Sequence, residues 1–139
     1  MRANLFLFFA VILWGIWGLA NKYAVDRAHP FTVQWMFAVP LALSIPLFYW
    51  LGAQSSPATN HDPNAFLWAF IAGTTSLLGT VLLFFALQDR PASIATAVTS
   101  VYPLVTLLLA VLTRTEGLSP PRIIGIVLMV LGMIVLQFG

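Results

Sequence analysis

The chain has 139 residues, of which 60% are hydrophobic, 14% aromatic and only 7% charged, with 6 Lys plus Arg against 4 Asp plus Glu. A soluble domain carries about 25% charged residues, so the composition excludes a water-soluble globule and an intrinsically disordered chain. The net charge of +2 comes from scattered side chains, and the absence of cysteine with only two isolated histidines, His29 and His61, excludes a disulfide framework, a thiol nucleophile and a metal cluster.

Charged residues fall only between long apolar runs, which predicts a multi-pass membrane protein. A charge at the centre of a bilayer costs roughly 2.5 to 3.5 kcal/mol, and about 20 apolar residues cross the hydrocarbon core. The last apolar run is extended back to include Pro120 and Pro121, which suit a first helical turn after Ser119. We therefore predict an all-α integral membrane protein with one transmembrane domain over residues 1–139 and five spans, at about 4–21, 31–51, 65–87, 92–113 and 120–138.

The first span carries aromatic and polar side chains on one helical face. The face is formed at offsets of 0, 3, 4, 7 and 8 by Trp14, Trp17, Gly18, Asn21 and Lys22. Trp14 lies about 15 Å into the membrane, too deep for an interfacial belt. Two interpretations remain open: an aromatic wall with a cation at its end that lines a solute cavity, or space-filling tryptophans with a lysine that snorkels to the headgroups.

The next two spans are bent or bear hydroxyl groups. The second contains Gln34, Trp35 and Ser44 with prolines at 40 and 46, and the third places a small and polar stripe on one side, made of Ala72, Ser76, Gly79 and Thr80. Bent, partly polar helices suit alternating access. Residues 52–64 between these spans form a polar linker that is too short to be a second domain.

The fourth span presents a hydroxyl face that is kinked by a proline. After a tight turn at residues 88–91, this face is formed by Thr96, Thr99, Ser100, Pro103 and Thr106. A proline inside a helix frees a carbonyl group, which a membrane helix tolerates when a neighbour or water bonds it. The face therefore either lines a pathway or serves as packing between helices.

The fifth span differs because residues 123–136 contain no hydroxyl, amide or charge. Gly125 and Gly132 lie seven positions apart on one face, where small residues let another helix approach closely. We interpret this span as a packing or dimerisation helix.

An odd number of spans places the two ends of the chain on opposite sides of the membrane. Three basic residues then lie on each side, namely Arg2, Arg114 and Arg122 against Lys22, Arg27 and Arg90. The positive-inside rule sets orientation from an excess of basic residues on one side, and here there is no excess. We therefore predict insertion in both orientations and head-to-tail packing of two copies. Alternatively, a Lys22 inside the membrane does not count, and a weak preference for a cytoplasmic N-terminus results.

The spans contain no carboxylate, since Asp26, Asp62, Asp89 and Glu116 all lie in connections. This argues against an intramembrane protease and a buried acidic proton relay. Neither histidine lies near a nucleophile, and there is no phosphate-binding loop. We therefore expect no enzyme activity and no cofactor. Two functions remain: a small-solute transporter, or a non-transporting helical partner that stabilises another membrane protein.

Several motifs resemble the EamA domain of the drug/metabolite transporter superfamily. Trp14, Gly15 and Lys22 match its Trp-Gly pair and the lysine that follows eight residues after the tryptophan. The second half matches in order and spacing at Phe85-Ala86-Leu87, Pro91-Ala92-Ser93-Ile94-Ala95-Thr96, Pro103, Thr115-Glu116-Gly117-Leu118, Gly125 and Gly132. The resemblance covers nearly the whole chain. It is unlike the four-helix small multidrug exporters, whose first-span glutamate has no counterpart here.

The resemblance implies a fold and a function. The family commonly has an arginine in the second span where this chain has Phe37, and it more often carries two inverted repeats in one ten-helix chain. One five-helix repeat implies a homodimer, possibly antiparallel, or a heterodimer with a similar repeat, in the cell inner membrane. We expect transport of small organic metabolites or drugs through a cavity lined by Trp14, Trp17, Asn21, Ser76, Thr80, Thr96, Thr99 and Ser100. Lys22 near one mouth would favour anions or zwitterions over cations.

Overall fold

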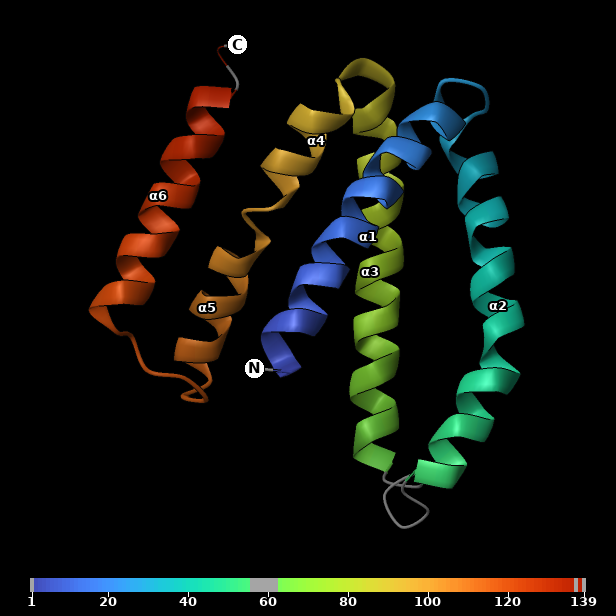
Figure 1. The fold of residues 1–139 in the computed structure, drawn as a ribbon, viewed down its shortest axis with the longest axis horizontal. Helices are drawn as coiled ribbons and strands as arrows, with labels where there is room; N and C mark the ends of the chain where they lie inside the picture. The colour runs from blue at the N-terminus through green and yellow to red at the C-terminus, as the bar shows by residue number, and fades with distance from the viewer. Residues whose placement is uncertain (1, 56–62, 137, 139) are drawn as a thin grey trace. The chain divides into compact units, whose positions relative to one another are not determined.

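The structure, a computed structural model, describes residues 2–55, 63–136 and 138, and all its regular elements in these ranges are helices (Figure 1). Four stretches in the described part of the chain are long and apolar enough to cross a membrane, and a fifth apolar helix is shorter. The predicted all-helical fold with five apolar spans is thereby confirmed. The helices are α1 (Arg2–Val25), α2 (Pro30–Ser55), α3 (Pro63–Asp89), α4 (Ala92–Thr99), α5 (Tyr102–Leu112) and α6 (Pro120–Leu136).

The first three helices extend beyond the apolar runs from which they were predicted. α1 continues through Lys22 to Val25, and α2 runs through both of its prolines to Ser55. Charged and polar residues end an apolar run, but they do not end a helix when their backbone groups keep bonding within it. Of the predicted linker, residues 52–55 and 63–64 are helical, and residues 56–62, with His61 and Asp62, lie outside the described residues.

The fourth span is broken where the sequence predicts a kink. α4 ends at Thr99, and α5 begins at Tyr102. The N–H groups of Val101 and Leu104 donate to carbonyl oxygens only three residues back, at 3.3 and 2.9 Å. Pro103 has no N–H to offer the carbonyl of Thr99, four residues earlier, so the regular helical ladder is interrupted in the middle of an apolar stretch.

α5 ends in a Schellman motif. Arg114 adopts a left-handed backbone with φ of 57°, and its N–H donates to the Val111 carbonyl at 3.0 Å. The N–H of Thr115 donates to the Ala110 carbonyl at 2.9 Å. These two bonds satisfy carbonyls at the helix end, which explains why a residue other than glycine takes this conformation.

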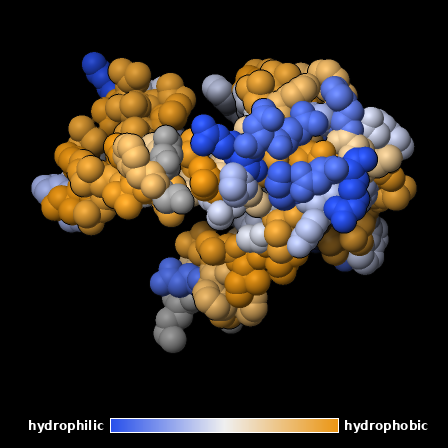
Figure 2. Space-filling model, turned by 90° about the horizontal axis from the view of Figure 1, so that it is seen from above, coloured by the Kyte–Doolittle hydropathy of each residue, from blue (hydrophilic) through white to orange (hydrophobic). Residues whose placement is uncertain are grey.

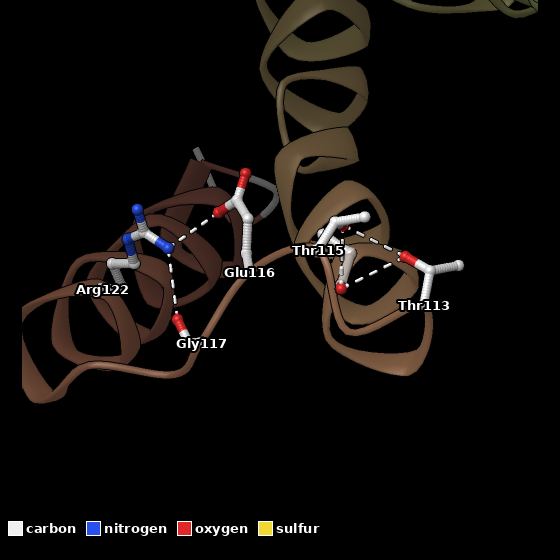
Figure 3. Close-up of polar contacts among 6 residues, drawn as sticks. Thr113, Thr115, Glu116, Gly117 and Arg122 are labelled. Atoms are coloured by element: carbon white, nitrogen blue, oxygen red, sulfur yellow. Dashed lines mark hydrogen bonds and ion pairs between the residues drawn. The ribbon is translucent and has the colours of Figure 1, made fainter.

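The connection to α6 is held by an ion pair (Figure 3). Arg122 Nη1 donates to Glu116 Oε2 at 2.7 Å and to the Gly117 carbonyl at 3.2 Å. α6 begins at Pro120, as the sequence predicts, and the Ser119 carbonyl accepts the N–H groups of Arg122 and Ile123. The loop is therefore fixed to the first turn of the helix that follows it.

The helices form two compact units. Unit 1 contains residues Met1–Leu19 and Arg90–Gly139, and unit 2 contains Ala20–Asp89, so α1 contributes to both. In unit 1, α4 packs alongside α6. In unit 2, α2 packs alongside α3, and a small buried cluster is formed by Val25, Pro30, Val33, Leu83, Phe84 and Leu87.

In the single chain, without lipid or a partner, most large apolar side chains are exposed. Seen end-on in Figure 2, apolar residues make up much of the visible surface. Exposing so much apolar surface to water is unfavourable, but such a surface is normal where a protein faces lipid. The packing of the helices therefore agrees with a bilayer as the surrounding solvent.

Candidate functional site

Lys22 joins the end of α1 to the end of α3 within unit 2. Its Nζ donates to the Leu87 carbonyl oxygen and to Asp26 Oδ1, each at 2.7 Å. Leu87 lies in the last turn of α3, where carbonyl groups have no partner within the helix and the helix dipole is negative. The ammonium group thus caps α3 from another helix, and its charge is matched by the carboxylate of Asp26, which directly follows the end of α1.

Two amide side chains in unit 2 have open hydrogen-bonding atoms. Asn21 is 6% exposed, and its Nδ2 has no hydrogen-bond partner in the described structure. Gln34 on α2 is half-buried, and its Oε1 is likewise buried and without a partner among the described residues. Unit 2 therefore holds one unused donor and one unused acceptor, which is unusual because buried polar atoms are nearly always paired.

In unit 1, α1 and α4 are in close contact at Gly18. A Cβ atom added at Gly18 would lie 2.9 Å from the Thr96 Cγ2 methyl. The Thr96 hydroxyl donates to the Ala92 carbonyl at 2.6 Å, which fixes the rotamer of this branched side chain. Gly18 is therefore the position that lets the two helices meet.

The hydroxyl groups of the predicted site bond to their own helices. Those of Thr80, Thr96, Thr99 and Ser100 each donate to a carbonyl three or four residues earlier. Such bonds occupy the hydroxyl hydrogen and leave the oxygen lone pairs available as acceptors. Thr99 and Ser100 are exposed and lie at the break between α4 and α5, so the most polar part of that span coincides with its irregular backbone.

The nine predicted site residues differ in burial and are divided between the two units. Asn21 is buried, and four residues are half-buried, namely Trp17, Lys22, Thr80 and Thr96. The other four are exposed, namely Trp14, Ser76, Thr99 and Ser100. Unit 1 holds Trp14, Trp17, Thr96, Thr99 and Ser100, and unit 2 holds Asn21, Lys22, Ser76 and Thr80. Their convergence on one cavity stays a prediction.

Sequence reasoning missed three features of this region. Asp26 was assigned only to a connection, although its position four residues after Lys22 is the spacing of a helical ion pair. Gln34 was noted as polar but was not placed in the site. The Leu87 carbonyl has no sequence signal, because a backbone acceptor becomes available only where a helix ends.

Phe37 stands where the resemblance described above implies an arginine. Its ring meets the ring of the fully buried Phe84 edge to face, with centroids 6.1 Å apart. Edge-to-face pairs stabilise packing beyond the area that they bury. The aromatic replacement thus joins α2 to the buried cluster of unit 2.

The long apolar helices and the broken fourth span define this chain as a multi-pass integral membrane protein. The model of the EamA-like transporter family matches residues 1–138. The chain belongs to this family of transporters, as its motifs predict.

An uncharacterized protein of Methanocaldococcus jannaschii is 36% identical to the chain over 78 residues. The matched region covers 56% of this chain and 57% of that protein. The chain thus spans a little over half the length of the curated relative that it matches. No solved structure matches the chain significantly.

Proposed function

We propose that this protein transports small organic metabolites or drugs across the cell inner membrane by alternating access. Residues 1–139 act as one transmembrane domain with five spans, and two such domains assemble into the working transporter. Membership of the EamA-like transporter family over residues 1–138 is the observation that carries this proposal. The protein is not expected to catalyse a reaction or to use a cofactor.

The broken fourth span supports transport rather than a purely structural role. Irregular backbone within a membrane is tolerated where it is buried in protein or lines a water-filled cavity, and discontinuous helices form the binding sites of many transporters. At the interruption at residues 100–101, Thr99 and Ser100 are exposed, and the Thr99 carbonyl cannot receive the usual helical N–H because residue 103 is proline. A polar solute would find several hydrogen-bonding groups there.

A flux measurement on the purified full chain in liposomes tests the proposal. The panel contains anionic, zwitterionic and uncharged labelled solutes. We expect uptake of at least one class above that of empty liposomes, and a loss of up to about tenfold for Thr99→Val, the cost of one hydrogen bond. Thr74→Val is the matched control, because Thr74 is equally exposed and donates to its own helix at the Phe70 carbonyl, 2.9 Å away.

Absence of flux for every class would favour the second candidate function, a helical partner that stabilises another membrane protein. One observation supports that alternative. α6 has no buried residue, and nothing lies within 4 Å of an added Cβ at Gly125 or Gly132. This face is therefore open to a helix from another chain.

We further propose that the assembly is a dimer, possibly antiparallel, in which copies insert in both orientations. The equal numbers of basic residues on the two sides of the five spans support this arrangement. A reporter fused after Gly139 is expected to give signal from both sides of the membrane. Adding one lysine beside Arg114 should shift the signal to one side, whereas signal from a single side in the unaltered chain would contradict dual insertion.

A further inference from the structure

We infer that Asn21 and Gln34 form the hydrogen-bonding part of the solute site, and that this site takes solutes that are electrically neutral overall. The inference rests on the proposed transport function and names its substrate class. Such a solute is uncharged, and it carries an acceptor for Asn21 Nδ2 and a donor for Gln34 Oε1.

Residues close in sequence to each amide contact the same turn of α3. Lys22, which follows Asn21, bonds the Leu87 carbonyl. Phe37, one turn beyond Gln34 on α2, packs against Phe84. Phe84 and Leu87 are three positions apart on α3, about 4.5 Å along the helix axis. The segments of α1 and α2 that carry the open donor and the open acceptor therefore meet one short stretch of α3.

Packing alone does not explain the open atoms, since an apolar residue would fill the same positions without the cost of an unpaired polar atom. Asn21 lies one turn before the buried Val25, and Gln34 follows the buried Val33. Apolar side chains thus occupy the neighbouring positions, and only these two carry unused polar atoms among the buried side chains that the structure describes. A bound polar solute would supply the missing partners.

The charges around the amides point to a neutral solute. The cation next to Asn21 is Lys22, and its ammonium already bonds the Asp26 carboxylate and the Leu87 carbonyl. Neither amide carries a charge of its own. An anion bound here would lose its hydration, and the charge of Lys22 is already matched by Asp26. Burying an unpaired anion in this way is costly. An uncharged amide or hydroxyl group is far less costly to desolvate, and hydrogen bonds to the two amides would replace those that it makes with water.

Cysteine labelling of the full chain in liposomes tests this inference without requiring the natural solute, because the chain has no cysteine of its own. Asn21→Cys and Gln34→Cys are treated with methanethiosulfonates that carry a neutral hydroxyethyl, an anionic sulfonatoethyl or a cationic trimethylammonioethyl group. Each rate is normalised to that of free mercaptoethanol. Val25→Cys is the matched control, because Val25 is as buried as Asn21 but belongs to the apolar cluster.

We expect both amide positions to react with the neutral reagent at least about tenfold faster than with either charged reagent, because a charge entering a buried site must be desolvated. Val25→Cys should not react. Equal normalised rates, or a faster anionic reagent, would overturn the neutral selectivity. Absence of reaction at both positions in a chain that shows flux would overturn the site and leave the transport proposal intact.

Asn21→Leu separates a solute contact from a packing defect. If Asn21 binds solute, this variant should resist detergent unfolding at least as well as the unaltered chain but lose flux of neutral solutes about tenfold. Unchanged flux would overturn the role of Asn21. Neutral-selective labelling in a chain that moves no solute would instead contradict transport and leave a binding site for neutral molecules.

Discussion

Gly18→Ala is expected to destabilise the protein by about 2 kcal/mol, the typical cost of overpacking a well-filled contact. The added methyl would lie 2.9 Å from the Thr96 Cγ2 atom. Thr96 cannot turn away freely, because its hydroxyl bonds the Ala92 carbonyl at 2.6 Å. α1 and α4 would therefore have to separate. Unfolding in mixed detergent micelles, followed by circular dichroism, measures the loss.

Gly15→Ala and Thr96→Ser provide the controls. Nothing lies within 4 Å of an added Cβ at Gly15, so Gly15→Ala should be neutral or should stabilise by about 0.5 to 1 kcal/mol through helix propensity. Thr96→Ser removes the clashing methyl and keeps the hydroxyl, so it should restore most of the stability of Gly18→Ala. If the two glycine variants proved equally stable, the close contact between α1 and α4 would be refuted.

The sequence predicts the membrane spans of this fold but not the close contact at Gly18. Spans were predictable because a bilayer makes each charge and each unbonded backbone group costly, so long apolar runs must be helices. The break at residues 100–101 was partly predictable, since Pro103 lacks the N–H that the ladder needs. The crowding at Gly18 was not predictable. The Trp14-Gly15 motif draws attention to Gly15, and a sequence does not tell which glycine contacts a neighbouring helix.

The sequence names candidate site residues, but it does not predict the contacts that these residues make. Helical spacing groups Gly18, Asn21 and Lys22 on one face of the first span, but it gives no reason to connect Lys22 with α3. That connection depends on where α3 ends, because only terminal carbonyls are available to an ammonium group. Gln34 was undervalued for a related reason: one amide among apolar neighbours is noticeable in a sequence, but only three-dimensional packing shows that its oxygen is buried and unpaired.

Lys22→Met is expected to lower the free energy of unfolding by about 2 to 3 kcal/mol, the range for loss of a hydrogen bond to a charged group. Methionine keeps most of the apolar stem but leaves the carbonyl of the fully buried Leu87 without its donor. Asp26 loses its partner as well, but its half-exposed carboxylate can be hydrated. Unfolding in mixed micelles again measures the change.

Asp26→Asn and Arg27→Met locate the origin of this loss. Asp26→Asn removes the ion pair and keeps the bond to Leu87, so it should cost no more than about 1 kcal/mol, as for exposed ion pairs. Arg27→Met removes an exposed cation that donates to the Tyr23 carbonyl and lies over the Tyr23 ring, both only four residues earlier in the chain, and it should cost less still. A Lys22→Met variant with unchanged stability and reduced flux of anionic solutes would instead place the ammonium on the transport pathway. It would also contradict the neutral solute site, because the charge of Lys22 would then be available to the solute.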